Sequence, residues 1–69
     1  MIELTSAYKQ IIDGKFLLNP AYIVYVNRCE NFNHSQYENV HSFVEYSGSA
    51  EMQQVYVQET YEEIKELLK

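Results

Sequence analysis

The sequence is poor in the residues that form disulfides, flexible repeats or phosphate-binding loops. Its 69 residues include one cysteine, two glycines, one proline and no tryptophan. The single Cys29 excludes an intramolecular disulfide and is typical of a reducing compartment. So few glycines and prolines exclude collagen-like and low-complexity chains, and no glycine-rich loop precedes a helical pattern. We therefore expect one globular domain, residues 1–69, in the cytoplasm.

Positive charge and long apolar runs are also scarce. Five Lys and Arg stand against ten Asp and Glu, which gives a net charge of −5. This balance repels a phosphate backbone and argues against double-stranded nucleic acid as a partner. The longest apolar run, residues 22–26, is far shorter than the ~20 residues of a membrane span, and no leader pattern precedes it. We expect no membrane association.

Side chains for metal or covalent chemistry are few. The candidates all lie between residues 29 and 41: Cys29, Glu30, His34, Glu38 and His41. Their Cys-x4-His-x6-His spacing matches no common zinc pattern. Cys29 and His34 could form a nucleophile and base, but no third orienting group is recognisable. The sequence therefore predicts no metal, no cofactor and no catalytic residue, and a pocket that joins Cys29 to a histidine would reopen the enzymatic hypothesis.

Apolar alternation predicts a β-rich chain. Asp13-Gly14 stands between two apolar runs, which indicates a two-residue hairpin turn with positive φ at both positions. Asn19-Pro20 ends the run that follows, and Ser47-Gly48-Ser49 indicates a later turn. Residues 30–39 form a polar connection longer than the ~2–5 residues usual in hairpins. The predicted strands are 2–5, 8–12, 15–19, 22–29, 39–47 and 52–59.

The C-terminal residues change to a helical period. Thr60 with Glu63 three residues on is a capping box. Helical spacing also relates four apolar residues: Tyr61, Ile64, Leu67 and Leu68. A helix over residues 61–68 is too short to persist alone, so its apolar stripe must lie on the sheet. The predicted fold is α+β: a small antiparallel β-meander of four to five strands with a C-terminal amphipathic helix packed on the sheet.

Three stretches of the chain resemble the FlbD family of small flagellar (swarming-motility) proteins. They are MIELT at residues 1–5, KFLLNP at 15–20, and VYVQET at 55–60 followed by EEI at 62–64. The resemblance implies a cytoplasmic protein, bacterial or phage-encoded, without a known active site. Residues 6–12 and 29–39 depart from the family pattern as enlarged loops. A new partner would be met there, so the resemblance does not imply a flagellar role.

Tyrosine is abundant. Seven Tyr and three Phe make 14% of the chain aromatic, which is more than so small a core can enclose. We expect most of a first group to be buried: Phe16, Tyr25, Phe43, Tyr46 and Tyr61. Exposed tyrosines among Asn, Ser and Gln are typical of protein-binding surfaces. The predicted partner surface comprises Phe32, Tyr37, Glu30, Glu38 and His34 of the polar connection, with Tyr22 at the Asn-Pro corner.

These features favour a non-enzymatic adaptor or modulator that binds a protein partner. One alternative is a phage inhibitor of a bacterial defence complex, favoured if a set of acidic residues shares one face: Glu30, Glu38, Glu45 and Glu51. A second is nucleotide binding by the aromatic rings with Arg28, Lys9 or Lys15, or a minor enzymatic role of Cys29 with a histidine.

The strand over residues 22–29 bears on association. Residues 23–26 are apolar on both faces, and the predicted helix can cover only one face of the sheet. We therefore expect this strand to be buried in a two-fold homodimer or against the protein partner.

Overall fold

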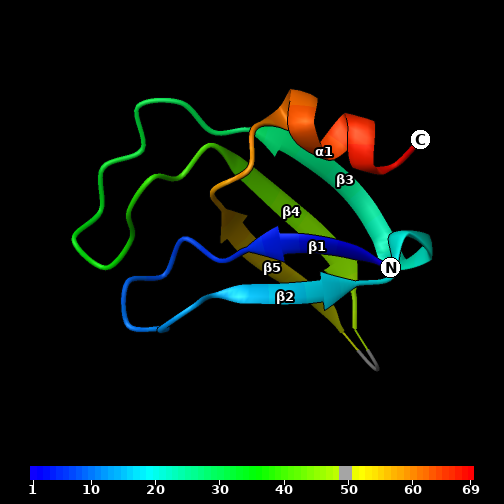
Figure 1. The fold of residues 1–69 in the computed structure, drawn as a ribbon, viewed down its shortest axis with the longest axis horizontal. Helices are drawn as coiled ribbons and strands as arrows, with labels where there is room; N and C mark the ends of the chain where they lie inside the picture. The colour runs from blue at the N-terminus through cyan, green and yellow to red at the C-terminus, as the bar shows by residue number, and fades with distance from the viewer. Residues whose placement is uncertain (49–50) are drawn as a thin grey trace.

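The computed structural model describes residues 1–48 and 51–69 and contains two antiparallel sheets and a C-terminal helix (Figure 1). The expected α+β class is confirmed. β1 pairs with β2, and the second sheet has the order β3-β4-β5. The elements are β1 (Ile2–Thr5), β2 (Lys15–Leu18), a 3₁₀ turn η1 (Pro20–Tyr22), β3 (Ile23–Arg28), β4 (Ser42–Ser47), β5 (Met52–Val57) and α1 (Tyr61–Leu67).

The hydrophobic core lies where the two sheets face each other. Strand alternation directs Leu4 of β1 inward and leaves Glu3 exposed, and on the second sheet it directs Val44 and Val57 inward. The buried core cluster is Ile2, Leu4, Leu18, Val44, Val57 and Ile64. Each of β1, β2, β4, β5 and α1 therefore contributes to one small core.

The two sheets are joined at one corner, where the end of β1 meets the end of β5. Ser6 forms a β-bridge with Val57, and the Gln58 N–H donates to the Thr5 carbonyl at 2.9 Å. The Thr5 N–H and hydroxyl both donate to the Glu59 carboxylate, each at 2.8 Å. These bonds fix the N-terminal strand against residues more than 50 positions later.

The prediction of a strand over residues 8–12 is wrong, because these residues lie in a loop. The first hairpin instead joins β1 to β2, with Thr5 opposite Lys15, and residues 6–14 form its loop. The Ser6 N–H donates to the Gly14 carbonyl at 2.8 Å and closes this loop. Asp13 has the expected positive φ of 52°, but Gly14 does not, so the predicted two-residue turn is also wrong. Ile12, next to Asp13 in this loop, is 95% exposed.

The strand predicted over residues 2–5 is confirmed as β1, and the other four predicted strands are confirmed with shorter bounds. The predictions 15–19, 22–29, 39–47 and 52–59 correspond to β2, β3, β4 and β5. β4 starts at Ser42 rather than at residue 39, and Asn39 itself takes a positive φ of 56°, outside the extended backbone of a strand. The expected turn at Ser47-Gly48-Ser49 lies partly outside the described residues; on its described side the Gly48 N–H donates to the Glu51 carbonyl at 2.8 Å.

The capping box of α1 is confirmed. The Glu63 N–H donates to Thr60 Oγ1 at 3.1 Å, and the Thr60 N–H donates to the Glu63 carboxylate at 2.9 Å. The expected apolar stripe is narrower than predicted, however. Ile64 is completely buried, whereas Leu67 and Leu68 are exposed because they follow the turn that reaches the core. One side chain therefore anchors this short helix in the core.

A candidate protein-binding loop

The connection between β3 and β4, residues 29–41 and here called the β3–β4 loop, brings several predicted site residues together. The Phe32 ring lies 4.5 Å from the Tyr56 ring, centroid to centroid, and the Tyr37 ring lies 5.1 Å from Tyr56. Phe32 and Tyr37 meet edge to face at 5.7 Å, and the His34 ring is 5.3 Å from Tyr37. These are favourable aromatic separations.

The aromatic contacts continue across the outer face of the three-stranded sheet. Phe43 lies 5.2 Å from Tyr56, and Tyr8 lies 5.5 Å from Tyr37. Because Val44 and Val57 face the core, their neighbours Phe43 and Tyr56 face the opposite side. We call the five half-buried rings the aromatic cluster: Tyr8, Phe32, Tyr37, Phe43 and Tyr56.

The sequence analysis did not predict all members of this cluster. Phe43 was expected in the core but lies on the outer face, and Tyr8 and Tyr56 were not predicted as site residues. The alternation of Phe43 with Val44 and of Tyr56 with Val57 was the available signal, since it places both rings on the face away from the core. No signal of this kind marked Tyr8, whose contact with Tyr37 joins two irregular loops.

Backbone hydrogen bonds hold the middle of the β3–β4 loop. Tyr37 forms a β-bridge with Tyr8. On either side of this bridge, the Lys9 N–H donates to the Gln36 carbonyl and the Glu38 N–H donates to the Ala7 carbonyl, both at 2.9 Å. The two enlarged loops that the sequence indicated therefore support each other.

The two ends of the β3–β4 loop are also fixed. Asn31 and Asn39 adopt left-handed φ angles of 57° and 56°, which asparagine tolerates better than most residues. His41 Nδ1 lies 2.9 Å from both the Asn39 and the Gln58 carbonyl oxygens. Because both partners are acceptors, Nδ1 carries the hydrogen and donates it. This contact ties the end of the loop to the end of β5.

The predicted partner-surface residues divide by position. Phe32 and Tyr37 are half-buried anchors, whereas His34, Glu30 and Glu38 are exposed. The loop tip, residues 33–36, is exposed throughout. Tyr22 is not brought to this loop: it is 55% exposed in η1 and lines a separate pocket with Leu18 and Tyr46.

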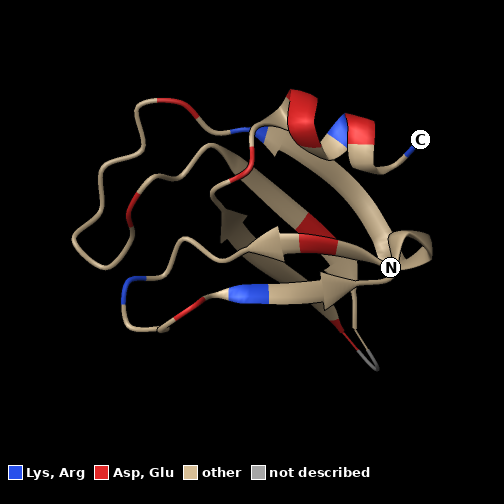
Figure 2. Cartoon of the chain, viewed as in Figure 1, with Lys and Arg blue, Asp and Glu red and all other residues tan. Residues whose placement is uncertain are grey.

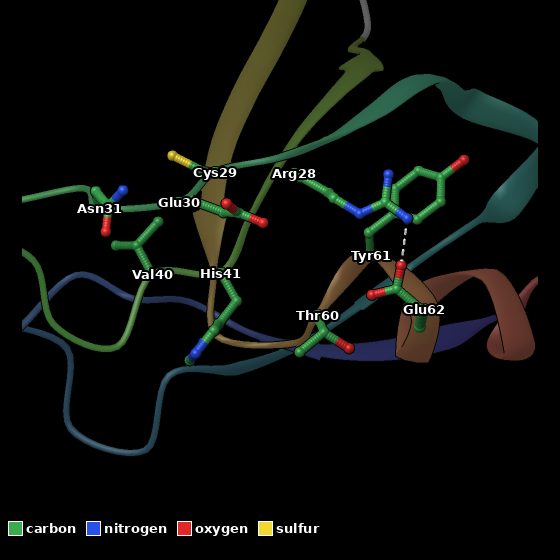
Figure 3. A pocket seen from close by; sticks show the side chains of 9 residues that line it. All are labelled: Arg28, Cys29, Glu30, Asn31, Val40, His41, Thr60, Tyr61 and Glu62. Carbon is green, nitrogen blue, oxygen red and sulfur yellow. Dashed lines mark hydrogen bonds and ion pairs between the residues drawn. The ribbon is translucent and has the colours of Figure 1, made fainter.

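A pocket of 360 Å³ at the start of the loop contains Cys29 and a histidine, His41 (Figure 3). The Cys29 sulfur and the His41 ring point away from each other in Figure 3, so they do not form a nucleophile–base pair. The Arg28 guanidinium lies over the Tyr61 ring, 4.3 Å from its centroid, and pairs with Glu62. Across residues 1–48 and 51–69, no group of three His, Cys, Asp or Glu side chains is placed to hold a metal.

Two carboxyl groups at the helix start have perturbed acidity. The hydrogen bond from Arg28 lowers the pKa of Glu62, and the hydrogen bond from the Thr60 N–H lowers the pKa of Glu63. Both side chains are therefore charged at neutral pH. A general acid would need a raised pKa, so these two groups act in helix capping and ion pairing.

The acidic residues are spread over several elements of the chain. Figure 2 shows acidic segments on α1, β1, β4, the β3–β4 loop and the β4–β5 hairpin. Glu30 and Glu38 lie in the loop, Glu45 lies within β4 and bonds Gln54, and Glu51 precedes β5 at the hairpin. These four residues therefore come from three separate parts of the chain.

Comparison with known proteins gives no relative for this chain: no family model matches it, and neither the curated proteins nor the solved structures contain a significant match. The FlbD resemblance therefore stays a prediction. No helix in the described part of the chain has the length and apolar character to cross a bilayer.

Proposed function

We propose that the protein acts as a small non-enzymatic adaptor or modulator that binds a protein partner through the tip of the β3–β4 loop. The observation that carries this proposal is the aromatic cluster, which anchors a long irregular loop at its centre. Loops of this length without secondary structure are usually functional or disordered. Here the Phe32 and Tyr37 rings hold the loop against Tyr56 of the sheet, and two backbone hydrogen bonds join it to the loop between β1 and β2.

Fixing the loop favours recognition because less conformational entropy is lost on binding. Ordering a mobile interface costs ~0.5–1.5 kcal/mol for each immobilised side chain. Folding already orders the half-buried Phe32 and Tyr37 rings, so binding does not have to order them. The exposed tip, residues 33–36, is left as a set of hydrogen-bonding groups, with Glu30 and Glu38 on its flanks. Such a surface fits a polar or basic patch on a partner protein.

The two alternatives receive less support from the geometry. The inhibitor hypothesis needs a gathered acidic face, and the acidic residues are dispersed. Nucleotide binding needs a cation beside the aromatic rings. Arg28 is engaged by Tyr61 and Glu62, which leaves the exposed Lys9 and Lys15 for that role.

The test is quantitative affinity capture from the source organism's lysate with the native chain and three variants. His34→Ala removes an exposed tip side chain, and Phe32→Ala removes an anchor of the loop. Gln10→Ala, on the exposed loop between β1 and β2, is the matched control. We expect a specific protein captured by the native chain and by Gln10→Ala to be lost or strongly depleted with the other two. Equal capture by all four chains, each shown to be folded, would contradict the proposal.

A further inference from the structure

Four of the described strands lie at sheet edges, and natural proteins usually protect such edges against pairing with other chains. β1 is four residues long, carries Glu3, and is joined through Thr5 to the residues that follow β5. β3 has a register shift between Ile23 and Tyr25 and runs beside α1. β2 is four residues long and begins with Lys15. β5, in contrast, is six residues long, and its sequence MQQVYV has neither a charge nor a proline. β5 is therefore the unprotected edge.

The backbone groups of β5 alternate in direction. The Gly48 N–H donates to the Glu51 carbonyl across the hairpin, so the bonded positions toward β4 continue at Gln53 and Val55. Met52 and Gln54 consequently direct their N–H and C=O groups to the outer edge. The next outward residue, Tyr56, already accepts a bond from the Ala7 N–H. Within the described ranges, no strand covers the edge at residues 52–54.

An apolar groove starts beside this edge at Val55 and continues between β2 and the end of β4. It comprises a pocket of 360 Å³ that includes Phe16, Tyr46 and Val55, and a pocket of 510 Å³ that includes Leu18, Tyr22 and again Tyr46. In Figure 1, α1 lies beside β3, and β1 lies between α1 and β2. The groove is thus the uncovered side of the core.

We propose that a second copy of this chain pairs its β5 antiparallel with β5 across a two-fold axis, so that one continuous sheet spans both copies. Only one register pairs all the free groups: Met52 lies opposite the partner's Gln54, and the axis passes Gln53. An axis at Gln54 would require Tyr56, whose carbonyl is already bonded to Ala7. The same register places the partner's Val55 opposite Glu51, next to the Gly48 end of the groove.

The charge of the groove permits a second copy as the occupant, and the register about Gln53 is what selects it, because it pairs the free groups of Met52 and Gln54 with each other. A net charge of −5 repels two copies in general. Of the residues described as lining the two pockets of the groove, Lys15 is the charged one, and none is acidic. The groove is therefore a face on which two acidic chains can approach each other. It also supplies apolar burial that a small core lacks.

The proposed interface differs from the one expected from the sequence. Val24 and Tyr25 of β3 are exposed, at 53% and 40%. The register shift at this position disrupts the regular edge that strand pairing needs. Ile23 and Val26 are half-buried and pack against the core, so this strand is not apolar on two free faces.

The test combines sedimentation equilibrium with amide hydrogen exchange of the full chain over a wide range of protein concentration. We expect a monomer–dimer equilibrium, with the Met52 and Gln54 amides becoming protected as the dimer forms. We also expect the melting temperature to rise with protein concentration. Neither measurement depends on the partner of the β3–β4 loop, so this inference and the proposed function fail separately.

Two variants locate the interface. Gln54→Pro removes an outward N–H and leaves the bonds to β4, so we expect a folded monomer. Met52→Lys adds a charge at the same edge, so we also expect it to be a folded monomer. It serves as the test if Gln54→Pro does not fold. Gln36→Lys makes the same charge change on the exposed loop tip and should still dimerise.

Three outcomes would overturn the proposal. The first is a native chain that remains monomeric at high micromolar concentration. The second is a dimer that persists in folded Met52→Lys, together with a native dimer in which the Met52 and Gln54 amides stay unprotected; this would place the interface elsewhere. The third is protection of these amides only when another protein is added, which would assign the edge to that protein.

Discussion

At the scale of single residues, Ser42 is the least satisfied side chain described. It is fully buried in β4, and its hydroxyl has no hydrogen-bond partner among the described residues. A buried polar group without a partner costs ~1–3 kcal/mol. We expect Ser42→Ala to leave the free energy of unfolding unchanged or raise it by about 1 kcal/mol, measured by urea denaturation. A clear loss of stability would show that the hydroxyl is bonded in solution.

The turn before β2 gives a second residue-scale prediction. Asp13 carries the positive φ, so Asp13→Gly should be tolerated, whereas Asp13→Val should lose ~1–2 kcal/mol in thermal unfolding. Gly14 is needed for a different reason: an added Cβ would lie 3.0 Å from the Ser6 carbonyl oxygen. Gly14→Asn should therefore be no better than Gly14→Ala. A clear advantage for asparagine would restore the positive φ that the sequence predicted at residue 14.

At the scale of elements, α1 depends on one side chain. Ile64 is completely buried, whereas Leu67 is 45% exposed on the same helix. Ile64→Ala should cost ~2–5 kcal/mol because it leaves a cavity in the core. Leu67→Ala is the control and should cost much less. Similar losses in chemical denaturation of both variants would mean that the helix packs through a broader face than the structure shows.

The capping box makes the stability of α1 depend on pH. The pKa of Glu63 lies below its ordinary value of 4.5, mainly because the Thr60 N–H donates to the carboxylate. Its stabilising contribution is therefore complete above that value and is lost as the pH falls through the lowered pKa. We expect the native chain to melt higher than Glu63→Gln at pH 7, with the difference shrinking as the pH falls below the ordinary value of 4.5. A difference independent of pH would contradict this assignment.

Local patterns predict some elements of this chain and miss others for a physical reason. Strand alternation and the Thr60–Glu63 spacing depend on neighbouring residues, so β1, β3 and the start of α1 could be predicted. The strand that pairs with β2 could not be predicted in this way. Residues 8–12 and residues 2–5 both offered apolar side chains for pairing, and the choice of β1 depends on the Ser6–Gly14 bond and on the core.

At the scale of the whole molecule, the candidate site was predicted only in part. The polar composition of residues 30–39 identified the loop and its rings. The contact of Phe32 with Tyr56 joins residues far apart in sequence and depends on how the loop folds over the sheet. Tyr22 was assigned to the partner surface for the same reason. Its position at the Asn-Pro corner follows from neighbouring residues, but its separation from the β3–β4 loop depends on the complete fold.

The overall charge leads to a prediction about association. Two copies of net charge −5 repel each other, but the proposed β5 interface is uncharged along its strand. Added salt should therefore strengthen the dimer, because it screens the repulsion without weakening an ion pair at the interface. Sedimentation equilibrium at about 20 mM and about 500 mM NaCl measures this dependence. A dimer weakened by salt would indicate an interface held by ion pairs and would contradict the β5 arrangement.

The bond between the start and the end of the chain also determines when folding can finish. β1 is synthesised first, yet Thr5 and Ser6 find their partners at Val57, Gln58 and Glu59. The core also requires Ile64. Nascent chains shorter than this keep the first strand without its final neighbours, and pairing between such distant residues is slow. The domain therefore completes its fold only after nearly all of its residues have left the ribosome.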